Sequence, residues 1–147
     1  MKLQKSHLFK NTVFKEGDET AKTVFSGAGK LEVGPAPEFE GSPETLNPEE
    51  MFVAAINNCL MATFFYFVRK SNVEILSYYS RAEGQVKKQA DGFRFTSVEV
   101  RAKVTLQHQG LVAKVREFGN LAEKYCLVSR SVNCPVHYEL KVKTTGN

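Results

Sequence analysis

The clearest hydrophobic pattern is an apolar segment in the middle of the chain. No charged residue occurs from Met51 to Val68. Asn47 is placed to cap a helix that begins there, and Pro48 suits the first helical position. We therefore predict one long central helix over residues 47–70. Because apolar residues lie on nearly all of its sides, most of this helix should be buried.

The segments after this helix alternate apolar and polar residues, as strands with one buried face do. This alternation is clearest from Val98 to Leu106. It predicts an antiparallel hairpin over residues 74–106 that turns at Ala90-Asp91-Gly92. A helical spacing of apolar residues predicts a second helix over 111–126, and alternation returns in a last strand over 134–143.

The region before the central helix is more irregular. Residues 1–33 should hold the N-terminal strands, an imperfect one at 3–14 and a short one at 20–26. Residues 34–46 follow as an acidic, proline-containing loop. The order of strands, long helix, hairpin, helix and strand is α+β. The 147 residues fit one domain, 1–147.

Composition and charge narrow the function classes. Three cysteines and no apolar leader favour a reducing, cytoplasmic location. The net charge is +4, but residues 35–50 hold five acidic residues and no basic one, and elsewhere the charges are mixed. No basic stripe with interleaved aromatics is evident, so nucleic acid is not an expected partner. Asn57 and Thr63 lie inside an apolar helix of minimal spanning length, so no membrane is expected either.

The cysteines are the candidate chemistry. Cys59 lies in the central helix and Cys126 ends the second helix, so the two thiols could exchange between dithiol and disulfide if they meet. Core packing is the alternative for each of them. Cys134 and His137 have the spacing of metal ligands, but residues three apart on a strand point to opposite faces. We therefore expect no metal site and no cofactor. We expect Cys134 to be a core residue.

Two cysteine motifs resemble the OsmC/Ohr family. The stretch from Asn47 through Cys59, NPEEMFVAAINNC, is similar to that family's N-P-E-x-L-x-x-A-x-x-x-C motif. The stretch AEKYCLVS, which contains Cys126, resembles its second motif, A-x-x-x-C-P-x-S. Phe39-Glu40-Gly41 before the first motif also matches. The similarity runs from about Glu38 to the end of the chain.

This resemblance implies an intertwined homodimer in which antiparallel sheets wrap around a long central helix. It also implies a peroxidase-like activity, the reduction of organic hydroperoxides, with an antioxidant function in oxidative stress. Cys59 would be the peroxidatic and Cys126 the resolving redox-active cysteine, and their disulfide would be restored by an unidentified dithiol reductant. Glu49 matches the family glutamate that holds an activating arginine.

Two positions depart from the family motifs. Glu38 stands where the OsmC branch commonly has Arg, and Leu127 stands where Pro is usual. A thiol in the middle of a helix gains little from the helix N-terminus, so we expect Cys59 to need a positive charge nearby. Lys22, Lys30 and Arg130 are the candidates. The alternative is a non-peroxidatic relative that binds a small apolar or thiol-reactive molecule in the dimer-interface pocket, and a third is a dimer with structural thiols only.

Overall fold

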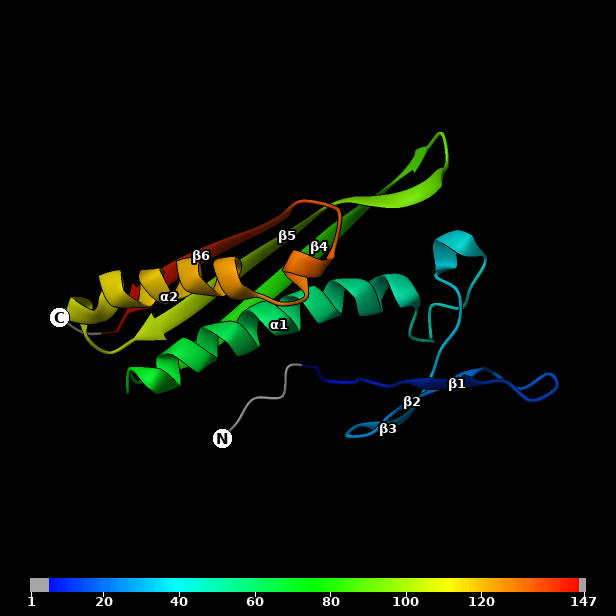
Figure 1. Ribbon diagram of the computed structural model, residues 1–147, viewed down its shortest axis with the longest axis horizontal. Helices are drawn as coiled ribbons and strands as arrows, with labels where there is room; N and C mark the ends of the chain where they lie inside the picture. The colour runs from blue at the N-terminus through cyan, green and yellow to red at the C-terminus, as the bar shows by residue number, and fades with distance from the viewer. Residues whose placement is uncertain (1–5, 146–147) are drawn as a thin grey trace. The chain divides into compact units, whose positions relative to one another are not determined.

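The computed structural model describes residues 6–145. The chain divides into two compact units, Met1–Met51 and Phe52–Asn147. Figure 1 shows the order of the elements in both. Together they form an α+β fold with two sheets and a long helix, which confirms the predicted class.

The first unit holds a three-stranded antiparallel sheet in the order β1-β2-β3. Its strands are β1 (Thr12–Phe14), β2 (Lys22–Phe25) and β3 (Gly29–Glu32). The strand predicted over 3–14 is therefore observed only over its last three residues, and its start lies outside the described residues. The sequence analysis missed β3 because its short GKLE sequence is exposed on every residue and gives no alternation.

The predicted loop contains a short 3-10 helix, η1 (Pro37–Phe39), followed by a tight turn. Glu40 has a left-handed backbone with φ 66°, and the Gly41 N–H donates to the carbonyl of Ala36. A Cβ on Gly41 would overlap the carbonyl group of Pro35. This close approach of two backbone segments explains why glycine is needed here.

The central helix α1 spans Pro48–Lys70, as predicted. The side-chain oxygen of Asn47 accepts a hydrogen bond from the backbone N–H of Glu50 at 2.8 Å, so Asn47 is the N-cap. The helix ends where Asn72 adopts a left-handed backbone with φ 53°. The bond from the Val73 N–H to the Val68 carbonyl completes a Schellman motif there.

The predicted burial of α1 is wrong for the single chain. Only one stripe of the helix, with a spacing of four residues, is buried: Ile56, Leu60, Phe64 and Val68. By length and composition alone, α1 could cross a membrane, and 22% of its most apolar 18-residue stretch is buried inside the chain. The core helix of a soluble protein can have the same length and composition. Apolar side chains on the other sides of α1 therefore stay at least partly exposed in one copy of the chain.

The second unit contains a three-stranded sheet in the order β4-β5-β6. The strands β4 (Ser77–Gln89) and β5 (Gly92–Leu106) form the predicted hairpin, and their pairing shifts register between Gln85 and Val86. The predicted sheets were antiparallel, but β6 (Val136–Thr144) pairs with β5 in parallel. The reason is the helix α2 (Val112–Tyr125), which carries the chain back before β6 begins, as parallel neighbours require.

The core of the second unit consists of two clusters of buried side chains. One joins the C-terminal half of α1 to α2 and the end of β5, around Phe64 and Phe118. The other lies around Ile56, Leu60, Val98, Val100 and Cys126. Alternate β5 residues supply both clusters, which confirms the face predicted from the sequence. Burial of each large side chain contributes about 1.5–3 kcal/mol.

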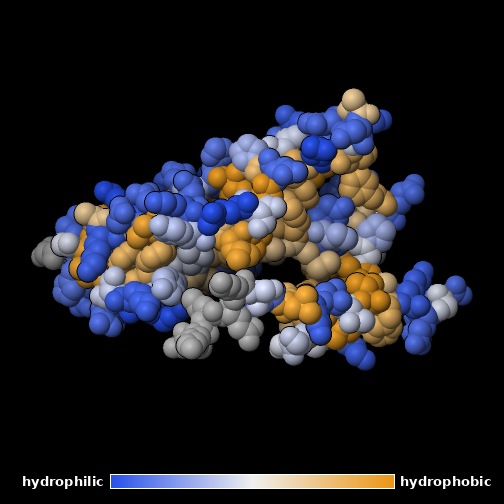
Figure 2. Space-filling model, in the orientation of Figure 1, coloured by the Kyte–Doolittle hydropathy of each residue, from blue (hydrophilic) through white to orange (hydrophobic). Residues whose placement is uncertain are grey.

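Large hydrophobic side chains also reach the surface, as Figure 2 shows for one face. In the second unit they come from α1, from β4 and the segment before it, from β5, and from the end of α2. They are Tyr66, Leu76, Tyr79, Phe93, Tyr125 and Leu127.

Candidate active site

Cys59 and Cys126 meet in the second cluster, although 67 positions separate them (126 − 59). Cys59 projects from the middle of α1 and is half-buried, whereas Cys126 is fully buried at the C-terminal end of α2. Both thiols are free. The structure therefore brings together the two cysteines that the sequence motifs single out.

A tight turn after α2 fixes Cys126. Its N–H donates to the Ala122 carbonyl at 2.9 Å, and its own carbonyl accepts from the Arg130 N–H at 3.1 Å. The Ser129 hydroxyl donates to the Cys126 sulfur, also at 3.1 Å. Backbone hydrogen bonding from Val128 and, less strongly, from Leu127 in this turn lowers the pKa of Cys59.

Hydrogen-bond donors surround the Cys59 sulfur. Burial raises the pKa of Cys59, but the Val128 N–H and the Cys126 thiol lower it, with smaller contributions from Thr63 and the Leu127 N–H. The net result is a pKa below the ordinary value of a thiol. The Thr63 hydroxyl gives its single proton to the Cys59 carbonyl at 2.8 Å and lies 4.0 Å from the sulfur, so we assign it the least weight.

The neighbouring thiol shifts in the opposite direction. Burial is the largest effect and raises the pKa of Cys126, and the adjacent Cys59 raises it further. Hydrogen bonds from the Ser129 hydroxyl and N–H lower the pKa but do not reverse the result. The pKa values of the two neighbouring thiols are thus shifted in opposite directions, so Cys59 ionises more readily than Cys126.

Within one chain, hydrogen-bond donors and not a positive side chain lower the pKa of Cys59. The groups that lower its pKa are N–H, thiol and hydroxyl donors, and none is a Lys or Arg side chain. Lys30 instead lies over the ring of Phe14, 5.5 Å from its centroid. Consecutive backbone N–H groups at a turn form an anion-binding concavity. A proline at position 127 would lack one of these N–H groups.

Glu49 lies in the first turn of α1. Its Oε2 atom is buried and has no hydrogen-bond partner among the described residues. Such an unpaired oxygen is rare in folded proteins, since buried polar atoms nearly always have a hydrogen-bond partner. Its role at the thiol site stays a prediction.

The third thiol, Cys134, is half-buried and packs against the same cluster as Cys59 and Cys126. It also borders a pocket of about 580 Å³ that the stacked rings of Phe52 and Phe95 help to line. His137 is exposed on the opposite face of β6. Within residues 6–145, no group of three His, Cys, Asp or Glu side chains is placed to hold a metal ion.

The amides of Asn57 and Asn58, next to Cys59 in the sequence, bond to groups other than its thiol. Asn57 accepts a hydrogen bond from the Ser80 hydroxyl at 2.7 Å, toward β4. Asn58 donates to the carbonyl of Ala54 in its own helix at 2.8 Å.

Sequence analysis missed several residues that shape the site. The Tyr78 and Tyr138 hydroxyls are 2.7 Å apart, and burial together with this contact raises the pKa of Tyr138. Their alternation in β4 and β6 indicated burial but not pairing. Leu127 and Val128 act through backbone groups, so their side chains carry no signal. The sequence indicated Ser129 only as part of the second cysteine motif.

The thiol pair and the two-sheet fold place the chain in a class of α+β thiol proteins. The OsmC-like protein family model matches residues 41–141, which include both cysteines. The chain therefore belongs to the OsmC-like protein family. No curated protein matches the sequence.

Solved structures share this fold at low sequence identity. An OsmC-like protein of unknown function from Vibrio cholerae is 24% identical, with a TM-score of 0.80 over 92% of this chain and 99% of the other. An organic hydroperoxide resistance protein OsmC from Legionella pneumophila is 18% identical, with a TM-score of 0.70 over 94% and 99%. The organic hydroperoxide resistance protein OhrB of Bacillus subtilis is 20% identical, with a TM-score of 0.63 over 93% and 100%.

Proposed function

We propose that this protein reduces organic hydroperoxides, with Cys59 as the peroxidatic thiolate and Cys126 as the resolving thiol. The observation that carries this proposal is that Cys59 and Cys126, both free thiols, lie in one side-chain cluster; the opposite directions of their pKa shifts support it. Family membership supports it, since several similar structures are described as organic hydroperoxide resistance proteins.

In the first step the Cys59 thiolate attacks one oxygen of the hydroperoxide ROOH. The O–O bond breaks, the attacked oxygen becomes part of a sulfenic acid, and RO⁻ leaves and takes a proton from water to form the alcohol ROH. The sulfur loses two electrons and the peroxide gains them. The N–H groups of Val128 and Leu127 favour this step because they stabilise the attacking thiolate.

In the second step the Cys126 sulfur attacks the sulfenic sulfur of Cys59. The S–O bond breaks, water leaves with the thiol proton, and an intramolecular disulfide forms. The Ser129 hydroxyl favours this step because its hydrogen bond lowers the pKa of Cys126 from the value that burial alone would set. A dithiol reductant then restores both thiols by exchange.

We also propose that two copies of the chain form the working protein. Only one stripe of α1 is buried, and Tyr66 on α1 is 48% exposed. The unpaired Glu49 oxygen would find its donor, a positively charged group, once the dimer forms. Replacing Glu49 by Gln should slow peroxide reduction about tenfold, the effect of a lost charge-assisted hydrogen bond of about 1.5 kcal/mol.

A peroxidase assay tests the proposed function. Purified protein is supplied with cumene hydroperoxide and a dithiol reductant, and peroxide loss is followed over time. We expect turnover that Cys59→Ser abolishes and that Cys134→Ser leaves intact. Wild-type protein that consumes peroxide no faster than Cys59→Ser would refute the proposal.

A further inference from the structure

The two cysteines of the thiol pair differ in how far solvent reaches them. Cys126 is 0% exposed in a single chain, whereas Cys59 is half-buried. A second copy of the chain cannot uncover Cys126, because it can only add to the burial within one chain. The proposed function already requires that a small molecule reach the Cys59 sulfur. Exposure therefore favours Cys59 as the sulfur that an external thiol attacks.

An approach to Cys126 would have to cross the core. Cys126 belongs to the cluster of buried side chains that contains Ile56, Leu60, Val98 and Val100. Each of these four side chains is at most 1% exposed. In thiol–disulfide exchange the attacking thiolate must contact the sulfur directly, so the rate depends on access. A reductant could reach Cys126 only by opening the turn after α2 or by displacing this core.

Leaving-group chemistry alone would favour the opposite choice. The thiol with the lower pKa leaves faster, and the pKa of Cys59 is lowered whereas that of Cys126 is raised. A thiolate that cannot reach a sulfur does not react with it, however good the leaving group is, so access decides. Cys126 then has to leave as the poorer leaving group. The Ser129 hydroxyl, which donates to the Cys126 sulfur at 3.1 Å, is placed to assist it.

We propose that the dithiol reductant attacks the disulfide at Cys59 and that the Ser129 hydroxyl assists the departure of Cys126. This inference rests on the proposed function, because it concerns the disulfide that peroxide reduction leaves. A thiolate of the reductant bonds to the Cys59 sulfur, the Cys59–Cys126 bond breaks, and Cys126 leaves with the electron pair and takes a proton from water. The second thiolate of the reductant then attacks the reductant's own sulfur in this mixed disulfide. Cys59 leaves, and the reductant becomes a disulfide, oxidised by two electrons.

The opposite pKa shifts of the two thiols suit this order of steps. Burial raises the pKa of Cys126, so after its departure Cys126 is protonated and does not attack the mixed disulfide again. The lowered pKa of Cys59 makes it a good leaving group in the second exchange. Cys59 is then released as a thiolate, which is the form that attacks the next peroxide.

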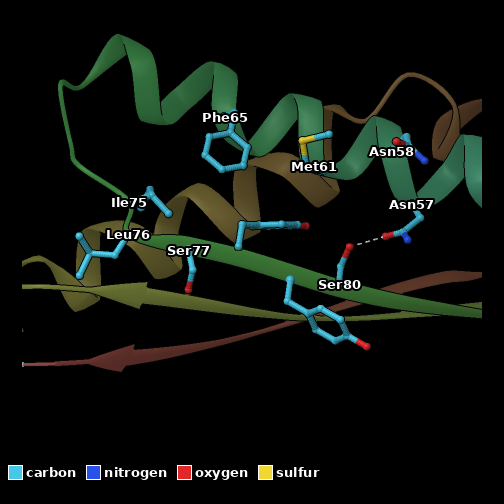
Figure 3. A pocket seen from close by; sticks show the side chains of 10 residues that line it. Asn57, Asn58, Met61, Phe65, Ile75, Leu76, Ser77 and Ser80 are labelled. Atoms are coloured by element: carbon cyan, nitrogen blue, oxygen red, sulfur yellow. Dashed lines mark hydrogen bonds between the residues drawn. The ribbon is translucent and has the colours of Figure 1, made fainter. Parts of the chain in front are cut away.

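The pocket of about 580 Å³ between α1 and the segment that leads into β4 is not the path to the disulfide. Cys59 is not among the ten residues that line this pocket. Figure 3 shows the residues that α1 contributes to it: Asn57, Asn58, Met61 and Phe65. Asn57 turns toward Ser80 of β4 there, whereas the Cys59 sulfur lies beside the turn after α2. The reductant therefore approaches α1 on the side next to that turn.

Mapping of the mixed disulfide tests the point of attack. Diamide oxidises the wild-type protein to the Cys59–Cys126 disulfide without peroxide, so the test does not need peroxidase activity. The oxidised protein is mixed with mercaptoethanol, a monothiol, and quenched at early times with excess N-ethylmaleimide. Peptide mass spectrometry then identifies the cysteine that carries mercaptoethanol. We expect at least about tenfold more of it on Cys59 than on Cys126, because access controls the exchange.

Two serines of the same turn separate assistance to the leaving thiol from packing. Ser129→Ala removes the donor to the Cys126 sulfur, so mercaptoethanol should open the disulfide about three- to tenfold more slowly, still at Cys59. Ser131→Ala is the matched control, because the exposed Ser131 donates to the Leu127 carbonyl and not to a sulfur. Its rate should stay within about twofold of the wild type. Ser129→Thr keeps the hydroxyl and should retain most of the wild-type rate.

Each result bears on a different part of the proposal. Mercaptoethanol found mainly on Cys126 overturns the point of attack and leaves the proposed peroxidase function standing. Equal rates in Ser129→Ala and Ser131→Ala overturn the role of Ser129. Protein that diamide does not convert to a Cys59–Cys126 disulfide overturns both this inference and the proposed function. Thermal melts identify loss of fold, and Ser129→Gly removes the same hydroxyl if Ser129→Ala is unfolded.

Discussion

Replacing Cys126 by alanine or by serine separates its two roles at Cys59. Alanine removes the hydrogen-bond donor, whereas serine keeps a donor hydroxyl of similar size at the same place. Neither variant can resolve a sulfenic acid. If the Cys126 thiol stabilises the Cys59 thiolate, the pKa of Cys59 should rise in Cys126→Ala and stay low in Cys126→Ser.

The size of the shift follows from the donor. A hydrogen bond to a charged group contributes about 1.5–3 kcal/mol, and a thiol is a weak donor, so the lower end applies. Because one pKa unit corresponds to about 1.36 kcal/mol, the pKa of Cys59 should rise by roughly one unit in Cys126→Ala. The Val128 N–H remains, so the shift should not reach the value of a buried, unassisted thiol.

The assay is alkylation by iodoacetamide across a pH series, with each cysteine quantified by peptide mass spectrometry. Below the pKa the thiolate fraction of Cys59 falls about tenfold in Cys126→Ala, and its intrinsic nucleophilicity rises about threefold, so alkylation should slow about threefold. Well above the pKa the alanine variant should react about threefold faster. Cys134 in the same samples is the internal control.

Midpoints in both variants that equal the wild-type midpoint would refute this reasoning. That result would mean that the backbone N–H groups alone set the pKa of Cys59. A midpoint that rises in both variants would show that the donor must be a thiol at its observed position.

Three further substitutions test the turn after α2 and the turn at Gly41. Leu127→Pro should raise the pKa of Cys59 by less than one unit, since the Leu127 N–H lowers it less than the Val128 N–H does, whereas Leu127→Ala should not change it because the side chain is 69% exposed; the same alkylation series measures both. The extended backbone of Cys126, with φ −62° and ψ 112°, already suits a residue before proline. Ser129→Ala should slow disulfide formation about three- to tenfold after one equivalent of peroxide, measured as loss of free thiols, without slowing Cys59 alkylation. Gly41→Ala should lower the melting temperature markedly, since its Cβ meets backbone atoms, and an unchanged melt would contradict the close approach.

The amino-acid sequence predicted the elements that carry strong periodicity. Asn47 and Pro48 marked the start of α1 correctly, and the alternation from Val98 to Leu106 located both β5 and its buried face. The parallel pairing of β6 was not predicted, because alternation shows which face of a strand is buried but not the direction of its neighbour.

For the site, the two motifs identified Cys59 and Cys126, and the structure places them together. The source of thiolate stabilisation was not visible in the sequence. We expected a positive side chain, but Val128 and Leu127 act through their backbone N–H groups, which every residue except proline possesses. Asn57 is near Cys59 in the sequence, yet its side chain bonds to Ser80 in β4, because residues two apart on a helix point in different directions.

A single-turnover experiment tests the central claim most directly. Reduced protein is mixed with one equivalent of cumene hydroperoxide without reductant, and the alcohol and the cysteine products are quantified together. The account predicts one alcohol per chain and one Cys59–Cys126 disulfide, and a sulfenic acid trapped on Cys59 in Cys126→Ser. Unreacted hydroperoxide, or first oxidation at Cys126 or Cys134, would contradict it.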